Sequence, residues 1–359
     1  MSGFLDLLRI TATLGVFLGH TNFLWFFGPS SIGPQNGQDY VIVFFVLSGF
    51  LISWSVDNKP DLNFNQYLFA RLTRLWTVVI PALAIGYALD YWGRSMNANT
   101  YESIWVGNHM LVKYLLTASF LNETWFLSVR PGTNSPLWSL SYELFYYLIF
   151  GLIMLLPTLK KKIIAGGIAA LLAGPKVILL FPCWLVGALT YKGCKYWRTN
   201  TILSWLLIIP SATFLVHRMI ERWNNWHPGE IQGLGLPPLF YSAKYFDDYC
   251  TAVALGLLIF GCSRWLKLSD DRKTFFGSLL QHLAGCSFSV YVIHFPLMAF
   301  IASLSASGNI PYLGLSTAIL LVLFLCYAFS FPFERPLGIY RSIVLSNFPF
   351  LSRKCGINS

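Results

Sequence analysis

Of the 359 residues, 55% are hydrophobic and 11% are charged, whereas a soluble domain carries about 25% charged residues. Charges this sparse cannot cover the surface of a soluble protein of this size, so the composition excludes a soluble domain and indicates an integral membrane protein. The net charge of +10 does not indicate a nucleic-acid partner, because the basic residues lie in short segments between apolar stretches rather than in one patch.

Apolar stretches of membrane-spanning length recur along the chain and predict an all-α, polytopic membrane protein of about ten transmembrane helices. The first stretch is too long for a signal peptide and lacks a small-residue cleavage site, so we expect it to be retained as a span. The fifth is short and rich in glycine. A further stretch, Met110–Leu121, is too short to cross and is expected to lie at the interface or to re-enter. The predicted spans lie near 4–27, 39–56, 72–92, 138–156, 163–175, 177–193, 202–219, 249–265, 284–304 and 313–333.

The basic residues also predict which way the spans run. The loops after the second, fourth, sixth and eighth spans, together with the C-terminal segment, hold 17 Lys and Arg, whereas the opposite loops hold seven. Loops rich in positive charge face the cytoplasm, so we expect both the N and the C terminus there. We divide the chain into a membrane-embedded domain, 1–340, and a short cytoplasmic C-terminal tail, 341–359.

The two longest predicted outside loops, 93–137 and 220–248, are rich in aromatic residues, glycine and proline. Long ordered loops in a compact protein are often functional, and aromatic faces there could stack on sugar rings. The alternative is the belt of Trp and Tyr that anchors membrane proteins at the interface. The tryptophans concerned are Trp92, Trp105, Trp125, Trp223 and Trp226.

The first predicted span contains three ionisable residues, and an ionisable group inside a membrane is costly enough to indicate function. Arg9 and His20 are 11 residues apart, which places them on one helix face, about 16 Å apart along the axis. Asp6 stands three residues before Arg9 and can pair with it. His20 can take up a proton near neutral pH, so we interpret it as catalytic; a packing histidine bonded to a neighbouring helix is the alternative.

Three further residues could complete a site. Glu143 lies in the fourth predicted span, which enters from outside, so we expect it at about the depth of His20. A carboxylate near an imidazole would orient it and stabilise its protonated form, although a structural bond to another helix or to water is the alternative. Arg71 and Arg74 project from one side at the start of the third span. They could clamp a phosphate group, or serve only as positive-inside anchors.

Other polar residues of the spans are weaker candidates. Ser48 and Gly49 permit close approach of two helices, which favours a structural role. Tyr291 and His294 lie three residues apart on one face, and His294 could serve chemistry or bond Tyr291 between helices. Glu334, at the end of its span, could anchor the helix end or a basic clamp, and a structural role is favoured. The seven cysteines contain no CxxC pair, and no residue set indicates a metal site.

Six stretches stand out in this order: Leu5–Arg9 followed by His20, Phe44–Ile52, Arg71 with Arg74, Trp138–Glu143, Ser289–His294 and Phe333–Pro336. Together they resemble the motifs of the acyltransferase-3 family of integral membrane acyltransferases, and the resemblance extends from about residue 4 to 336. The chain departs from the family pattern at Ile10, where a glycine is common. We also expect no C-terminal hydrolase-like domain of the kind that some relatives carry.

The resemblance implies a function. Members of this family move acyl groups, commonly acetyl, from acyl-CoA to hydroxyls of surface polysaccharides, peptidoglycan, lipid-linked sugars or small molecules. It implies that Arg9 and His20 match the essential pair and that Arg71 and Arg74 match the arginine motif. It also implies acyl-CoA as co-substrate, a carbohydrate or glycolipid acceptor, surrounding membrane lipid, and the plasma (inner) membrane of a bacterium as location.

We therefore hypothesise a membrane O-acyltransferase in which His20, assisted by Glu143 and Arg9, acts on an acceptor hydroxyl while Arg71 and Arg74 hold acyl-CoA. One alternative is a transporter or flippase of a lipid-linked or sugar substrate, although the sequence has no inverted repeat or pair of interrupted helices. Another is an acyltransferase that acts on a small cytoplasmic molecule. A non-catalytic receptor is disfavoured by the buried Arg9 and His20. We expect no permanently bound cofactor, no metal and no nucleic-acid partner.

Overall fold

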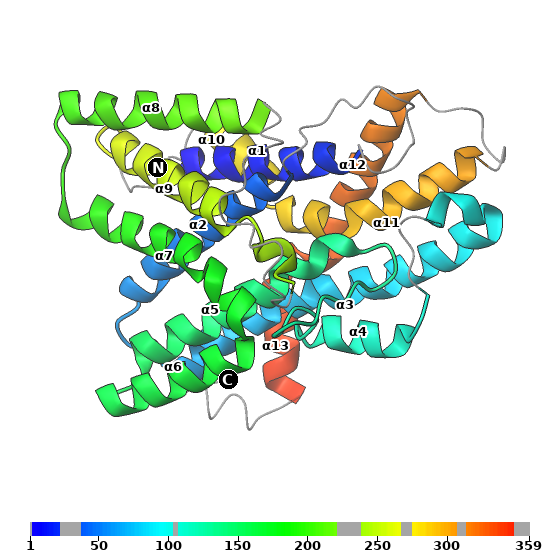
Figure 1. Ribbon diagram of the computed structural model, residues 1–359, viewed down its shortest axis with the longest axis horizontal. Coiled ribbons are helices and arrows are strands. Elements are labelled where there is room, and N and C mark those ends of the chain that lie inside the picture. Colours follow the sequence, from blue (N-terminus) through cyan, green and yellow to red (C-terminus); the bar gives the residue numbers. More distant parts are fainter. Residues whose placement is uncertain are drawn as a thin grey trace. The chain divides into compact units, whose positions relative to one another are not determined.

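The computed structural model describes residues 2–21, 37–102, 107–220, 238–266, 275–306 and 314–347. In these ranges the chain forms α-helices and short 3-10 helices and no β-strand, so the predicted all-α fold is confirmed (Figure 1). The α-helices are α1 Ser2–Thr21, α2 Gly37–Asp57, α3 Phe64–Met96, α4 Met110–Ala118, α5 Trp138–Leu155, α6 Leu159–Ala173, α7 Pro175–Tyr196, α8 Thr201–Ile220, α9 Tyr245–Cys262, α10 Phe275–Ala284, α11 Ser287–Ala306, α12 Leu315–Phe333 and α13 Leu337–Asn347. The 3-10 helices are η2 Ala98–Tyr101, η3 Ser135–Leu137 and η4 Phe240–Ser242.

Nine helical segments in the described part of the chain are long and apolar enough to cross a membrane, and they match nine of the ten predicted spans. The last of them, Ser316–Asn347, combines α12 and α13. The fifth predicted span, 163–175, falls on α6, whose 15 residues are fewer than the roughly 20 that a bilayer requires. The short α4 has nine residues, in agreement with the prediction that this stretch does not cross.

Some sequence-based expectations stay predictions. The structure does not test the cytoplasmic location of the two termini. It also does not test the division of the chain at residue 340, a boundary that lies inside α13. The residues that end the first predicted span, 22–27, lie outside the described ranges.

The helices belong to two compact units. The first unit is formed by Met1–Gly19, Ile32–Pro60 and Ala173–Ala284, and it therefore holds α2, α7 to α10 and most of α1. The second is formed by His20–Ser31, Asp61–Leu172 and Gly285–Ser359, and it holds the end of α1, α3 to α6 and α11 to α13.

In the first unit, α2 and α7 pack backbone to backbone at two glycines. A Cβ atom built on Gly49 would lie 2.0 Å from the carbonyl oxygen of Trp184, and one built on Gly187 would lie 1.9 Å from that of Val46. Only a hydrogen atom fits at these distances, so neither position accepts a larger residue. The Trp184 indole also donates a hydrogen bond of 3.2 Å to the Ser48 hydroxyl. The structural role predicted for Ser48 and Gly49 is thus confirmed.

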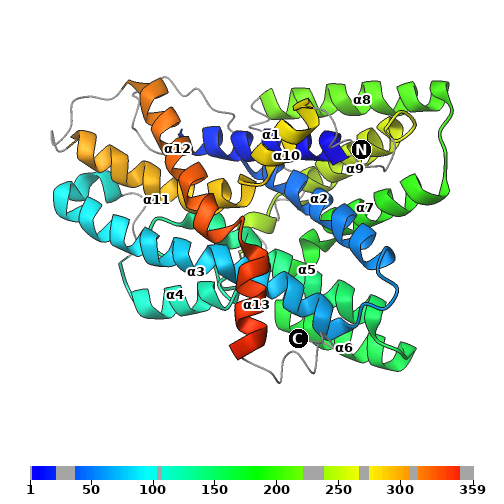
Figure 2. The same ribbon diagram turned by 180° about the vertical axis from the view of Figure 1, so that it is seen from behind.

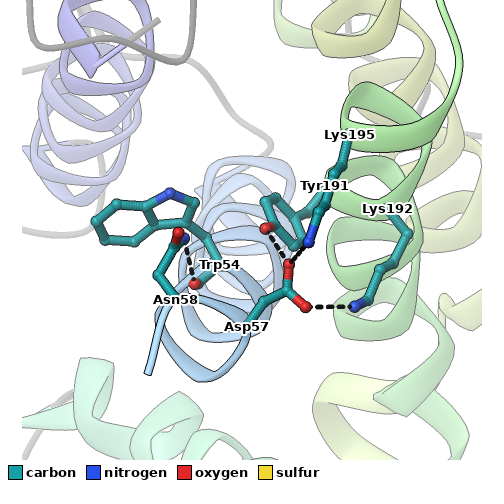
Figure 3. A network of polar contacts seen from close by, with 6 residues as sticks. All are labelled: Trp54, Asp57, Asn58, Tyr191, Lys192 and Lys195. Atoms are coloured by element: carbon teal, nitrogen blue, oxygen red, sulfur yellow. Dashed lines mark hydrogen bonds and ion pairs between the residues drawn. The ribbon is translucent and has the colours of Figure 1, made fainter. Parts of the chain in front are cut away.

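At the C-terminal end of α2, the Asp57 carboxylate is held by three side chains of α7 (Figure 3). It accepts a hydrogen bond of 2.6 Å from the Tyr191 hydroxyl, forms an ion pair of 3.1 Å with Lys192, and bonds to Lys195. Both lysines are partly exposed, and an exposed ion pair contributes at most about 1 kcal/mol. The network therefore holds the ends of α2 and α7 side by side but adds little to the free energy of unfolding of the unit.

A buried ionic cluster lies near the start of α2. Arg218 of α8 forms ion pairs with Asp39 of α2 at 3.3 Å and with Asp247 of α9 at 3.4 Å. Asp39 also accepts a hydrogen bond of 3.0 Å from the Thr251 hydroxyl of α9. Loss of one partner of such a buried pair would leave an uncompensated charge, which costs roughly 3–5 kcal/mol. The cluster thus fixes the alignment of three apolar helices.

In the second unit, α3 supports most of the other helices. It begins with a capping box, in which the Asn63 side chain accepts the Gln66 backbone N–H at 2.9 Å and the Gln66 side chain accepts the Asn63 N–H at 3.2 Å. Along its 33 residues α3 packs on α11, α5, α12 and α13 (Figure 2). Its early turns carry Arg71 and Arg74.

A proline inside α11 explains how this helix joins the unit. Pro296 has no N–H, so the carbonyl of Val292, four residues earlier, loses its usual helical partner. The side chain of Asn134, from the segment that leads into α5, donates a hydrogen bond of 2.8 Å to that carbonyl. Gly86 of α3 lies opposite, where a Cβ built on it would be 3.4 Å from the proline ring. The segment before α5, α3 and α11 therefore contact one another around Pro296, and these contacts fix the position of α11.

Candidate active site

The first of the predicted site residues is Arg9 of α1. Its guanidinium forms an ion pair with Asp6, with 3.5 Å between Nη1 and Oδ1. Because this is the i, i+3 pairing that the sequence predicts, the expectation is confirmed. Both side chains are partly buried, where an isolated charge is costly, and the ion pair partly neutralises each charge with the other.

His20, at the end of α1, contacts α11. Its Nδ1 atom lies 2.9 Å from Nε2 of His294, and the two ring centroids are 5.0 Å apart. Phe295 packs edge-on against the His20 ring, with 5.1 Å between centroids. His294 is fully buried, whereas His20 is only partly buried. Of the two imidazoles, His20 is therefore the one with a surface open to a substrate.

The hydrogen-bond partners assign the protons of the two rings. Nδ1 of His294 lies 2.8 Å from the carbonyl oxygen of Val290 and 3.0 Å from that of Tyr291. Carbonyl oxygens only accept, so this Nδ1 carries a proton and Nε2 of the neutral ring is an acceptor. His20 must then donate its Nδ1–H to His294, which leaves the lone pair of a neutral His20 on its own Nε2. The geometry therefore defines which nitrogen of His20 can act as a base.

The same arrangement suits the protonated form of His20. A proton on Nε2 leaves the Nδ1–H bond to His294 in place and strengthens it, because a charged donor makes a stronger hydrogen bond than a neutral one. His294 thus resembles in role the orienting member of a catalytic triad, although it is neutral. Any effect of His294 on a reaction at His20 would therefore act through the orientation of the His20 ring. Among the described residues, no three His, Cys, Asp or Glu side chains are arranged to hold a metal ion.

Two stretches that stand out in the sequence, Trp138–Glu143 and Ser289–His294, meet at Tyr291. Its hydroxyl donates a hydrogen bond of 2.5 Å to the carbonyl of Pro136 and accepts one of 2.6 Å from the Ser139 hydroxyl. The bond between His294 and Tyr291 that the sequence left open involves the Tyr291 backbone carbonyl and lies within α11 rather than between two helices. The tyrosine side chain instead fixes the start of α5 to α11.

Glu143 lies on α5, partly buried, and accepts a hydrogen bond from the hydroxyl of Tyr147 one turn further along. The carbonyl of Tyr147 in turn accepts a hydrogen bond of 3.1 Å from the Tyr67 hydroxyl of α3. The guanidinium carbon of Arg71 lies 5.6 Å from the centre of the Tyr67 ring, and Arg71 and Glu143 attract one another electrostatically. The carboxylate thus belongs to the surroundings of Arg71. Its predicted pairing with His20 stays a prediction.

The arginine pair lies on one helix, as predicted, with Arg71 partly buried and Arg74 exposed. Arg74 also interacts electrostatically with Glu334, at the end of α12. The Glu334 carboxylate accepts the backbone N–H of Ser289 at 2.8 Å, which complements the positive end of the α11 dipole. The structural role favoured for Glu334 is confirmed, but the helix end that it anchors is the start of α11 rather than the end of its own helix.

The aromatic residues of the predicted outside loops are described only in part. Trp92 and Trp125 are 55% and 42% exposed, and Trp125 has a φ of 51°, in the left-handed region. Such exposure fits either an interfacial belt or a sugar-binding surface. Trp105, Trp223 and Trp226 lie outside the described residues.

The residue that sequence reasoning left undecided is His294. A histidine in the middle of an apolar span was a sufficient signal to single it out. Its role depends on a partner 274 positions away in the chain, which no spacing within one span could identify.

The fold and this site define an integral membrane protein with a hydrogen-bonded pair of histidines held among its helices. Over residues 2–335 the sequence matches the family described as an acyltransferase domain, acyltransferase-3. This match covers nearly the whole chain, so the chain belongs to the acyltransferase-3 family. The resemblance carried by the six stretches is thereby confirmed.

Curated relatives of the chain carry acyltransferase names. It is 28% identical over 321 residues to "Acyltransferase MdmB" of Streptomyces mycarofaciens, which covers 82% of this chain and 78% of the relative. It is 26% identical over 335 residues to a Staphylococcus aureus (strain COL) protein named "Putative O-acetyltransferase", covering 86% of this chain and 52% of the relative. The "O-acetyl transferase" of Shigella phage Sf6 is 26% identical over 157 residues, which are 41% of this chain and 44% of the relative.

The chain therefore spans about half the length of the Staphylococcus aureus relative, which is 52% covered. No solved structure gives a significant match.

Proposed function

We propose that the protein is a membrane O-acyltransferase that moves an acyl group, in particular acetyl, from acyl-CoA to a hydroxyl of a carbohydrate or lipid-linked glycan. The observation that carries the proposal is the hydrogen bond between His20 and His294, which supports Nε2 of His20 as the base in a member of an acyltransferase family. Acyl transfer to a hydroxyl needs such a base. The names of two relatives support oxygen as the accepting atom.

In the proposed reaction, Nε2 of His20 takes the proton of the acceptor hydroxyl as its oxygen attacks the thioester carbonyl. A C–O bond forms, the C–S bond breaks, and CoA leaves as a thiolate. The proton on His20 then passes to the sulfur, so the products are the ester and the free CoA thiol, and His20 is neutral again. His294 accepts the Nδ1–H of His20 throughout and holds the ring. A transient acyl-histidine on Nε2 is a variant of the same chemistry.

The donor phosphates are assigned to Arg71 and Arg74. CoA carries a diphosphate and a further phosphate on its ribose, and a planar guanidinium binds phosphate oxygens with two hydrogen bonds at once. Arg9 is a further donor-binding candidate, since it lies about 16 Å from His20 along the α1 axis. This separation is comparable to an extended pantetheine arm, which supports a donor whose phosphates and thioester lie at opposite ends of the span.

Glu143 has two proposed roles that one substitution separates. If its carboxylate assists His20, Glu143→Gln should lower kcat and leave the KM for the donor unchanged. If it instead orients Arg71 through the cluster with Tyr147 and Tyr67, the same variant should raise the donor KM.

The experiment that tests the proposed function uses purified protein in lipid nanodiscs with radiolabelled acetyl-CoA and a glycolipid and polysaccharide extract of bacterial membranes. We expect thiol release together with base-labile label on the extracted glycans. Binding of glycolipid with no release of CoA thiol would contradict an acyltransferase and would favour a transporter or flippase. Label found only on small water-soluble molecules would contradict the glycan acceptor.

A further inference from the structure

The last described helix, α13, places an additional arginine on α3. Figure 2 shows α13 lying across α3, and the two helices are in contact. The Arg341 guanidinium of α13 donates a hydrogen bond of 2.7 Å from Nη2 to the Ala70 carbonyl and one of 3.1 Å from Nε to the Thr73 hydroxyl. Since Ala70 and Thr73 flank Arg71 and precede Arg74, the guanidinium rests on the stretch of α3 that carries the arginine pair.

Three positive charges are thereby gathered in one place. Arg341 is partly buried and is repelled electrostatically by both Arg71 and Arg74. Two carboxylates offset part of this charge, because Glu143 attracts Arg71 and Glu334 attracts Arg74. The three arginines still repel one another where Arg71 and Arg341 are partly buried, and a bound anion would relieve that repulsion. The cluster keeps a net positive charge and therefore points to an anionic ligand.

Arg341 also retains capacity to bind such a ligand. A guanidinium has five N–H donors, and two are used on α3, so three have no protein partner among the described residues. The two bonds to α3 fix its plane, and a planar guanidinium held in place matches phosphate geometry. The family match ends at residue 335 and so does not include this helix.

We propose that Arg341 forms, with Arg71 and Arg74, a three-arginine site for the phosphate groups of the CoA donor. The inference rests on the proposed function, and it adds a binding role for α13. A role limited to holding α13 on α3 would need only the bonds to Ala70 and Thr73. The two roles differ in how substitution changes the affinity for donor phosphates.

The test measures CoA binding by calorimetry with purified full-length protein in nanodiscs of phosphatidylcholine, which carry no anionic lipid. Arg341→Ala and Arg341→Gln should each weaken CoA binding by about tenfold or more, because each removes a charged hydrogen bond to phosphate. The KM for acetyl-pantetheine, a donor without these phosphates, should not change. Arg341→Gln retains a donor for α3, so it covers the case in which the alanine variant does not fold. Lys161→Ala, which removes an exposed positive charge from α6, is the matched control and should bind CoA normally.

The outcomes separate this inference from the proposed function. Unchanged CoA affinity in folded Arg341 variants, with affinity lost in Arg71→Ala, would overturn the third arginine and leave the donor site in place. Unchanged affinity in all three arginine variants would overturn the proposed donor site itself. If the Arg341 variants bind CoA normally but lose anionic phospholipid in native mass spectrometry, the cluster holds a lipid phosphate and the inference is overturned.

Discussion

Replacement of His294 by leucine removes the atom that accepts the Nδ1–H of His20, and it keeps an apolar side chain of similar size in a fully buried position. The His20 ring then loses the contact that fixes its orientation and its tautomer. A hydrogen bond to a charged group contributes about 1.5–3 kcal/mol. Since about 1.4 kcal/mol corresponds to a tenfold change in rate, we expect kcat to fall by about 10- to 150-fold. The donor KM should stay within about twofold, because no phosphate contact changes.

Two matched variants separate this effect from general damage to α11. In His294→Gln the side-chain carbonyl can accept a hydrogen bond near the position of Nε2, so part of the lost kcat should return. Tyr291→Phe removes two buried hydrogen bonds, to Pro136 and from Ser139, without touching His20. It should lower thermal stability and leave the kcat of the folded protein nearly unchanged.

The assay is the initial rate of thiol release from acetyl-CoA by purified protein in nanodiscs, with a fixed amount of membrane glycolipid extract. Rates are normalised to the folded fraction from size-exclusion chromatography. A leucine variant with kcat within twofold of the unsubstituted protein would refute the positioning role of His294. A glutamine variant no faster than the leucine variant would show that the accepting atom at this position does not matter.

Three further predictions concern packing and donor binding. Asn134→Ala should lower the free energy of unfolding by about 1–3 kcal/mol, because it leaves the Val292 carbonyl unpaired. The same substitution should lower it less in a protein that also carries Pro296→Ala, because residue 296 then supplies an N–H to that carbonyl. A double-mutant cycle of thermal unfolding checks this, and equal losses in the two backgrounds would contradict it. Gly187→Ala should sharply lower the melting temperature, because its Cβ would lie 1.9 Å from a backbone oxygen of α2. Gly167→Ala is the control and should not lower it, because a Cβ built there meets no atom of another segment within 4 Å. Arg71→Ala should raise the donor KM by about tenfold or more with kcat nearly unchanged, and a normal donor KM would remove Arg71 from the donor site.

The helices themselves were largely predictable, because the length of an apolar stretch reports directly on whether it can span a bilayer. The exception is the fifth predicted span, which at 15 residues on α6 is shorter than the usual requirement. Local pairings were also accessible from spacing. Asp6 and Arg9 pair as i, i+3 neighbours can, and Gly49 lies where two helices approach closely.

Contacts between distant helices were not predictable in the same way. Helix periodicity places His20 and Arg9 on one face of α1, but it does not say which helix lies opposite, and so the partnership with His294 required the structure. Pro296 likewise signals that a carbonyl in α11 lacks its helical N–H, yet nothing in its neighbourhood names Asn134 as the substitute donor. For Arg341 the obstacle was similar, since a basic residue near the C-terminal end is ordinary in a membrane protein until its contact with α3 is seen.

The most direct test of the central claim is acyl transfer by His20→Ala protein that is correctly inserted and present in wild-type amount. Transfer of label from radiolabelled acetyl-CoA to the glycans of membrane extracts should fall by about 100- to 10,000-fold, the usual contribution of general acid–base catalysis. CoA affinity should stay unchanged, because the donor phosphates are assigned to arginines. Near-normal transfer by this variant would contradict the claim that His20 is the base.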